Sequence, residues 1–146
     1  MTRVRQLLAQ KDARIWTVDA DATVFDAIAT MANKNVGSLI VMKSGKLLGI
    51  ITERHYSRNV ALKGKTSPTI PVREIMEKNV ICVGPDTSVE ECMEVMTDER
   101  VRHLPVLDDG EVVGIVSIGD LVKSMINDQK FIIDQLEHYI HGEACV

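Results

Sequence analysis

Residues 101–120 read VRHLPVLDDGEVVGIVSIGD, and residues 36–55 read VGSLIVMKSGKLLGIITERH, a match displaced by 65 positions. It runs without a gap from residues 15–56 to residues 80–121, and ten of the aligned pairs are identical. A period of this length indicates tandem structural units. Two equivalent units imply a pseudo-twofold module with two equivalent clefts, which favours a binding device over a catalyst with one asymmetric centre.

A short preamble is repeated as well. Residues 4–8 read VRQLL and residues 72–76 read VREIM, at an offset of 68 instead of 65. This difference predicts extra chain near residues 9–13 of the first copy. Because the preamble recurs, we expect it to form part of each structural unit.

Length and composition limit the class of protein. A chain of 146 residues fits one domain of ordinary size, whereas each half is marginal alone, so we expect a shared core. The net charge of −4 gives no general attraction to nucleic acid or to anionic membranes. One Trp, two Tyr and two Phe leave few rings for stacking on bases. We therefore expect neither nucleic acid nor membrane as a partner.

The cysteines and the apolar runs bear on location. Three cysteines without a CxxC pair are typical of a reduced, intracellular protein. No apolar run approaches the ~20 residues that span a bilayer. These features favour the cytoplasm, although the basic start MTRVRQLLAQKDAR also fits a fragment of an organelle presequence.

Each unit has the predicted order α-β-α-β-β-α, so the fold class is α+β. Apolar spacing at i, i+3, i+4 and i+7 predicts the central helices, which Thr23 and Ser88 cap. Gly45 and Gly110 mark hairpin turns between the strands, because glycine adopts positive φ there. The predicted ranges in the two copies are helices 4–10 and 72–78, extended segments 15–18 and 81–83, helices 24–34 and 89–99, strands 38–42 and 103–107, strands 47–52 and 112–117, and helices 53–62 and 118–126.

We place the repeats at 1–64 and 72–127, a polar linker at 65–71, and a C-terminal helix and tail at 128–146. The helix predicted over 127–141 has no counterpart in the first copy, and Gly142 is its expected stop. Two roles stay open for it: closing the edge of its own core, or packing against a second chain. Its apolar face carries Phe131, Ile132, Leu136, Tyr139 and Ile140.

The second hairpin strand of each copy leads into a helix through a hydroxyl residue followed three positions later by a polar one. These pairs are Thr52 with His55 and Ser117 with Asp120. One interpretation is structural, because Ser-x-x-Asp is a helix-capping box. The other is functional, because free N–H groups and the helix dipole attract an anion, and a carboxylate accepts hydrogen bonds from ribose hydroxyls.

The preamble, the segment Val101–Val106, and the pattern Asp109-Gly110-x-Val112-Val113-Gly114-Ile115-Val116-Ser117-x-x-Asp120, with their first-copy counterparts, resemble a tandem pair of CBS (cystathionine-β-synthase) domains, called a Bateman module. The resemblance covers the chain up to about Asn127 and points to stand-alone CBS-pair proteins. It implies a homodimer, built as a flat disc of four repeats. It also implies an adenosine-containing ligand: AMP, ADP, ATP, NAD(H) or S-adenosylmethionine.

The resemblance also implies a role for each candidate residue. Asp120 would hold the ribose and Ser117 the phosphate, with Ile115 on the same strand. Arg102 and His103 would reach the phosphates, although a solvated charged rim is the alternative for both. The residues expected to enclose the adenine are Ile15, Thr17, Val36, Gly37 and Ser38.

The first copy departs from the pattern. His55 occupies the position of the acid, and a neutral imidazole does not accept two ribose hydroxyls as a carboxylate does. We therefore expect unequal sites, with the main one at Asp120 and a weak, empty or differently used one at Thr52 and His55. Arg54 either serves a phosphate there or is an exposed helix residue.

Three function classes follow. The first is a non-catalytic sensor that signals energy or redox state to an unknown partner protein, and the second is a constitutive assembly module. An enzyme is the third, but the sequence contains no nucleophile–base pair, Walker loop or metal cage, and Cys82 fits a core position. We expect no catalytic cofactor, and a solvated chain end rather than a metal site at His138, His141, Glu143 and Cys145.

Overall fold

The computed structural model describes residues 1–10, 15–64 and 69–140. Its first repeat contains strand β1 (Thr17–Asp19), helix α2 (Val24–Lys34), and strands β2 (Ser38–Lys43) and β3 (Lys46–Thr52). Helix α3 (Glu53–Tyr56) follows and continues into the π-helical turn η1 (Ser57–Ala61). The sheet order is β1-β2-β3, with β1 parallel and β3 antiparallel to β2.

The second repeat has the same plan. It contains helix α4 (Val89–Glu99), strands β4 (His103–Asp108) and β5 (Glu111–Ser117), and helix α5 (Ile118–Ile140). Thr23 and Ser88 cap α2 and α4 as predicted, each accepting a hydrogen bond from the N–H three residues later. The hairpins have equivalent registers and turn through positive φ at Gly45 and Gly110.

The segment expected to be extended at 81–83 pairs with β4 through one parallel bridge, between Val83 and Val106. One predicted element of the second copy is wrong. Residues 72–78 form no α-helix but only the 3₁₀ turn η2 (Val72–Glu74). The reason is tertiary: the N–H of Val72 donates to the carbonyl of Ala22, and Glu77 pairs with Ile50. These bonds draw the segment along the first repeat instead of into a helix.

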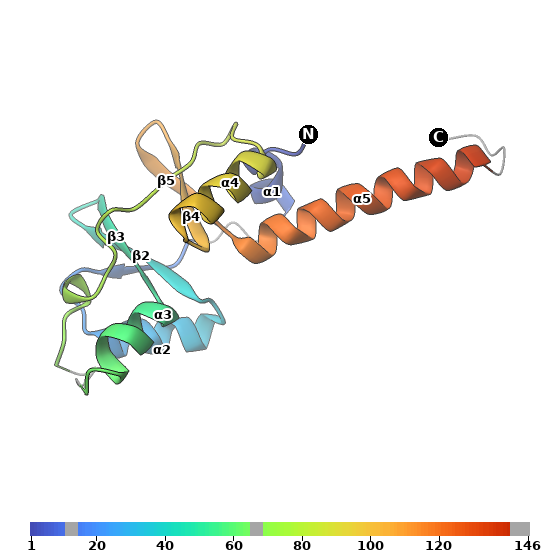
Figure 1. Ribbon diagram of the computed structural model, residues 1–146. Helices are drawn as coiled ribbons and strands as arrows, with labels where there is room; N and C mark the ends of the chain where they lie inside the picture. The colour runs from blue at the N-terminus through green and yellow to red at the C-terminus, as the bar shows by residue number, and fades with distance from the viewer. Residues whose placement is uncertain (11–14, 65–68, 141–146) are drawn as a thin grey trace.

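The two preambles are exchanged between the repeats. Helix α1 (Val4–Gln10) lies beside α4 (Figure 1), and the Val4 N–H donates to the carbonyl of Thr87 at 2.9 Å. Val4 is fully buried in the second core, whereas Val72 is fully buried in the first. The preamble of the first repeat therefore completes the core of the second repeat, and the preamble of the second repeat completes the core of the first. The described residues form two cores, each completed by the other repeat's preamble, instead of the single shared core that the chain length suggested.

The surface around each exchange carries a matching ion pair. Arg73 pairs with Asp21 in the first repeat, and Arg5 pairs with Asp86 at 3.2 Å in the second. Lys43 joins the first pair, and hydrogen bonding to Lys43 is the main reason that the pKa of Asp21 is lowered. Because these side chains are exposed, the pairs contribute little to the free energy of folding.

Helix α5 is longer than predicted. The helices expected at 118–126 and 127–141 form one continuous helix of 23 residues, which extends away from the body (Figure 1). Only its first two turns pack on the second core, through Leu121 with Ile118 and Met125. Closure of the chain's own core by the tail is therefore not observed. The linker residues 65–68 and the expected stop at Gly142 lie outside the described residues.

Candidate functional site

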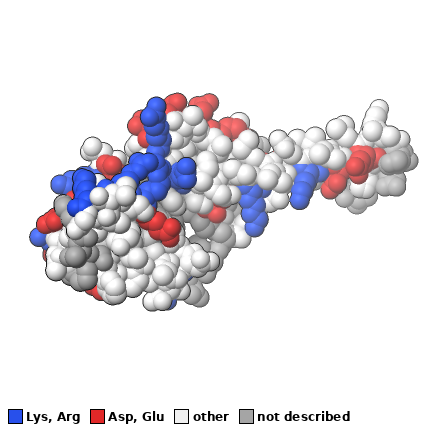
Figure 2. Space-filling model, turned by 60° about the horizontal axis from the view of Figure 1, so that its bottom comes forward, with Lys and Arg blue, Asp and Glu red and all other residues white. Residues whose placement is uncertain are grey.

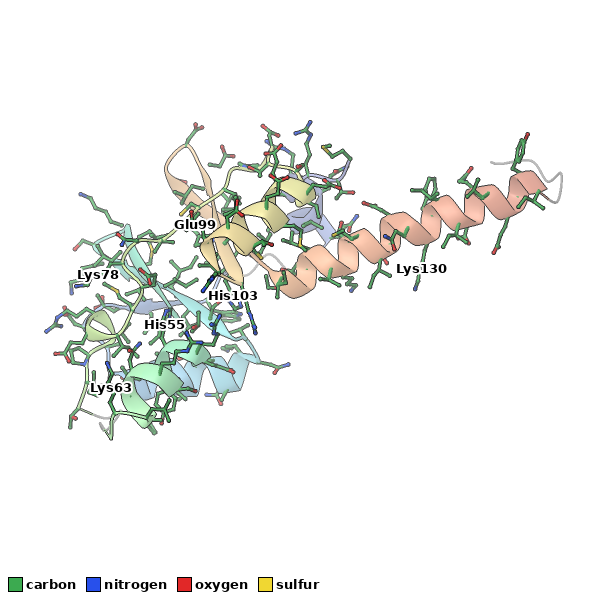
Figure 3. All side chains as sticks on the ribbon, viewed as in Figure 1. His55, Lys63, Lys78, Glu99, His103 and Lys130 are labelled. Atoms are coloured by element: carbon green, nitrogen blue, oxygen red, sulfur yellow. The ribbon has the colours of Figure 1, made fainter. Side chains whose placement is uncertain are left out.

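A cavity of about 390 Å³ lies at the junction of the two repeats, where α3 of the first faces the α4–β4 corner of the second. Ligand pockets for small molecules begin at roughly 300 Å³. Figure 3 shows His55 and His103 on neighbouring elements at this junction. Six of the residues selected from the sequence line the cavity: Gly37, Thr52, Arg54, His55, Arg102 and His103.

The cavity joins residues that the sequence had assigned to different clefts. Arg102 and His103 were expected beside Asp120, but they line a common space with Thr52 and His55. The start of β4 borders this space, because Val101, Arg102 and His103 all line the cavity. Gly37 lies close to His103: a Cβ added at Gly37 would make an ordinary van der Waals contact with Nε2 of His103, at 3.8 Å.

The end of α3 that faces the cavity is closed by Thr52 and His55. The His55 N–H donates to Thr52 Oγ1 at 3.3 Å, and the Thr52 N–H donates to His55 Nδ1 at 3.1 Å. Burial lowers the pKa of His55; the carboxylate of Glu77 opposes this, and the nearby Arg54 and Arg58 lower the pKa further. The ring is therefore neutral at pH 7, and with Nδ1 accepting, Nε2 carries the proton.

Ser117 and Asp120 form the equivalent box on α5. The Ser117 N–H donates to Asp120 Oδ2 at 2.9 Å, and the Asp120 N–H donates to Ser117 Oγ at 3.2 Å. The structural interpretation of this motif is thus correct in its geometry. Neither residue lines the cavity at the junction. Ser117 lies opposite His103 in the β4–β5 ladder, so the box adjoins the cavity through that strand pair.

The other five expected residues lie on strands or just before them, outside the cavity lining. Ile15 precedes β1 and is half-buried, and Thr17 is exposed and opposite Ile40. Val36 packs against the first core, and Ser38 is buried opposite Thr52. Ile115 is half-buried on β5, opposite Pro105.

Charged side chains that the sequence analysis did not select complete the cavity. They are Glu53, Arg58, Glu77, Glu99 and Arg100. With Arg54 and Arg102, the lining contains four arginines against three glutamates, plus two histidines. Arg54, Arg100 and Arg102 also border an adjoining hollow of about 280 Å³. Figure 2 shows Lys and Arg side chains gathered in one band across the body. A balance of this kind suits an anion that also presents hydrogen-bond donors.

Arg100 has an unfavourable backbone conformation. It ends α4 in the left-handed region, with φ 55° and ψ 41°. The equivalent residue of the first repeat is Asn35, with φ 54°, and asparagine tolerates this region better than arginine does. Strain at a cavity-lining residue is a reason to look for a role of its side chain.

The metal-ligating and thiol groups of the described residues bear on the enzyme alternative. They contain no group of three or more His, Cys, Asp or Glu side chains that could hold a metal ion. Of the tail residues considered for a metal, His141, Glu143 and Cys145 lie outside the described part. Burial raises the pKa of the Cys82 thiol, and raises that of Cys92 to about 11, so both are protonated at pH 7. No described helix is long and apolar enough to cross a membrane.

The fold and the site together define a class: a duplicated α+β module with a charged cavity where its repeats meet. The model of the CBS domain family matches residues 4–61 and 72–127. The chain belongs to the CBS domain family and contains the domain twice. This confirms the resemblance and the fold class inferred from the sequence.

Relatives support this assignment. The mitochondrial CBS domain-containing protein CBSX3 of Arabidopsis thaliana is 42% identical over 127 residues, covering 84% of this chain and 62% of that protein. The chain thus spans less than two thirds of that relative's length. A solved CBS-domain protein from Burkholderia ambifaria has 47% identity and a TM-score of 0.85, covering 88% of this chain and 96% of that one.

A third similar protein is a CBS domain pair crystallised in complex with 5′-methylthioadenosine and S-adenosyl-L-methionine. It has 26% identity and a TM-score of 0.76, covering 87% of this chain and 98% of that one. Both of its ligands are adenosine compounds, and one is charged. They show the kind of molecule that a module of this shape holds in another protein.

Proposed function

We propose that this chain is a non-catalytic regulatory module that binds an adenosine-containing nucleotide in the cavity between its repeats. The observation that carries the proposal is the cavity itself, in which residues from both repeats meet. A ligand that contacts both repeats favours one relative arrangement of them, and it shifts an equilibrium by its differential affinity for the two arrangements. We also propose that a partner protein recognises the arrangement of the repeats that the ligand favours.

The cavity lining suggests where each part of a nucleotide lies. Arg54, Arg100 and Arg102 converge on the cavity and the adjoining hollow, so the phosphate is assigned to this side. His55, neutral and donating through Nε2, and Glu77 offer partners to a ribose or a base. Asp120 and Ser117 are assigned to a second, pseudo-equivalent subsite.

The direct test is isothermal titration calorimetry of the full chain with AMP, ADP, ATP, NAD(H) and S-adenosylmethionine. Arg102→Gln should weaken binding of the preferred ligand about tenfold or more, because a charge-assisted hydrogen bond is lost. Arg5→Gln is the matched control, since it removes an arginine from an exposed pair with Asp86. Equal affinity in Arg102→Gln and the wild type would contradict the phosphate assignment.

Asp120→Asn and Asp120→Ala separate capping from ligand binding. Asparagine retains an oxygen for the Ser117 N–H, whereas alanine removes the cap. If Asp120 holds a ribose, both variants lose affinity. If it only caps α5, Asp120→Asn binds as the wild type does, and the second subsite is not a nucleotide site.

Arg100→Asn distinguishes a functional arginine from a tolerated one. Asparagine relieves the left-handed strain, so the variant should be more stable by up to about 1 kcal/mol in urea unfolding. The same variant should bind the ligand several-fold more weakly. Gain of stability without loss of affinity would leave Arg100 outside the site.

A constitutive assembly module is the second candidate, and the exposed apolar face of α5 favours it. Homodimerisation through the repeats is compatible with either candidate. A thermal-shift screen with the same nucleotides discriminates: no rise in the unfolding temperature with any of them favours assembly. Mass spectrometry of small molecules released from the purified chain identifies a ligand that is already bound.

A further inference from the structure

The free part of α5 carries an apolar stripe that continues the face packed on the second core. Leu121 and Met125 occupy this face where α5 lies on the body. Farther along, the same face is exposed, from 46% at Ile126 to 82% at Tyr139. Residues on the exposed stripe are Ile126, Ile132, Ile133, Leu136, Tyr139 and Ile140.

A helix with such a face needs a partner. Most of the stability of protein helices comes from packing of the apolar face, and a short isolated helix is marginal in water. Thr2 Oγ1 donates to Asp128 at 3.0 Å, which holds α5 to the body up to that point. About three further turns extend beyond it, as Figure 1 shows.

The spacing of side chains on this segment specifies how two such helices would meet. In a heptad register, Ile126, Ile133 and Ile140 occupy one core position, and Val122, Gln129 and Leu136 occupy the other. Lys130 and Glu137, seven residues apart, flank this seam on one side, and Ile132 and Tyr139 flank it on the other. Figure 3 shows Lys130 on the projecting part of α5.

The flanking charges favour one direction of pairing. In an antiparallel pair, each flanking position faces the same flanking position of the other helix. A register that sets Ile133 against the partner's Leu136 also sets Lys130 against the partner's Glu137. It further sets Ile132 against the partner's Tyr139. Twofold symmetry repeats each of these contacts. A parallel pair would instead set Lys130 and Glu137 beside apolar side chains.

We propose that residues 129–140 of α5 pair antiparallel with the same residues of a second copy of this chain, with Lys130 opposite the partner's Glu137. The argument rests on charge self-complementarity in the same register that buries the apolar stripe. This contact lies on the C-terminal extension, beyond the repeats, and is independent of the nucleotide proposal.

A membrane surface is the less favoured occupant. Interfacial helices are rich in Lys and Arg on the polar face and bind anionic lipid. The polar face of this segment carries Asp128, Asp134 and Glu137 against Lys130. Its acidic balance opposes binding to anionic lipid, whereas opposite charges in the antiparallel register attract a second copy.

Sedimentation velocity of the full chain over a dilution series tests the pairing. Lys130→Glu alone sets one carboxylate against another at both symmetry-related contacts, and Glu137→Lys alone sets one ammonium group against another at both. Each variant should associate about tenfold more weakly than the wild type. An equimolar mixture of the two variants restores opposite charges at both contacts of the mixed pair.

 In the mixed pair, both the contact from position 130 to position 137 and its reciprocal join a carboxylate to an ammonium group, so the mixture should regain wild-type association. Failure of the mixture to associate better than either variant alone would overturn the antiparallel register.

An apolar pair of variants tests the stripe itself. Leu136→Ser should abolish the association, whereas Phe131→Ser should leave it unchanged. Phe131 is comparably exposed and apolar but lies on the opposite side of the helix. Equal sedimentation of wild type and Leu136→Ser, or equal loss in both variants, would overturn the proposal. Calorimetric titration of Lys130→Glu with nucleotide should match the wild type, so failure of this proposal is distinguishable from failure of the proposed function.

Discussion

Gly49 on β3 and Gly114 on β5 occupy equivalent positions, and each lies against an exchanged preamble. A Cβ on Gly49 would lie 2.6 Å from the carbonyl oxygen of Glu77 and 2.8 Å from Sδ of Met76. The atoms nearest to a Cβ on Gly114 would belong to the flexible side chain of Leu8, at 2.6 Å. Glycine is therefore needed at both sites for close approach and not for backbone conformation.

The two positions should respond differently to alanine. Gly49→Ala collides with backbone that is held by the Ile50–Glu77 bridge, so we expect a loss of about 3 kcal/mol of unfolding free energy. Gly114→Ala collides with a flexible leucine and should cost about 1 kcal/mol. Urea unfolding of both variants checks this order. A larger loss in Gly114→Ala would show that the first preamble, which contains Leu8, is held more rigidly than the second.

Individual residues also show which part of the cavity lining could be predicted from the sequence. Thr52, Arg54, His55, Arg102 and His103 were found because they occupy repeated or motif positions. Glu77 and Glu99 carry no such signal, since they reach the cavity only through the exchange of the preamble and the end of α4. Nothing in the sequence marks Arg100, because its counterpart in the first repeat is Asn35, a common residue at the end of a helix. Only the positive φ of Arg100 in the structure draws attention to it.

At the scale of elements, the capping boxes that start α3 and α5 differ in the group that closes them. A carboxylate closes the box on α5, whereas a half-buried imidazole closes that on α3. Nδ1 of His55 accepts the Thr52 N–H only while the ring is neutral. This makes the start of α3, which borders the cavity, sensitive to pH.

The sign of the pH effect follows from the lowered pKa of His55. The unfolded chain binds the proton more readily than the folded one, near the ordinary value of 6.5. The cap therefore contributes its full stability above that pH and loses it as the pH falls through the folded pKa. We expect a loss of about 1 kcal/mol attributable to this cap in unfolding measured between pH 7.5 and pH 5.

His55→Gln is the control for this prediction. Glutamine at the same position also completes a capping box but does not titrate. The variant should retain stability at pH 7.5 and show a shallower decline toward pH 5. Parallel pH profiles for the two proteins would assign the decline to other groups.

The preambles show where prediction of elements stops. Residues 4–8 and 72–76 have nearly the same pattern, and the helix predicted over 4–10 is correct to the residue. The second preamble instead forms η2 and bridges to β3, because Val72 and Glu77 bond to the first repeat. The two preambles have nearly identical local sequence patterns, so tertiary hydrogen bonds decide which of them forms an α-helix.

At the scale of the whole molecule, the exchange of preambles is what makes two marginal halves into one module. Each core takes its last buried residues from the neighbouring unit, Val4 and Leu7 in one case and Val72 and Ile75 in the other. The duplication was evident from the sequence. Which copy each preamble joins was not, because the same apolar pattern fits either core equally well.

The exchange of preambles predicts which repeat is destabilised by a substitution in each preamble. Val4→Ala and Val72→Ala each remove fully buried methyl groups and should cost about 2 kcal/mol. Hydrogen exchange followed by mass spectrometry should show Val4→Ala weakening protection in α4, β4 and β5, at the far end of the chain. Val72→Ala should weaken α2, β2 and β3 instead. Loss of protection in the repeat nearest in sequence to each substitution would contradict the exchange, because local opening follows the core that a side chain occupies.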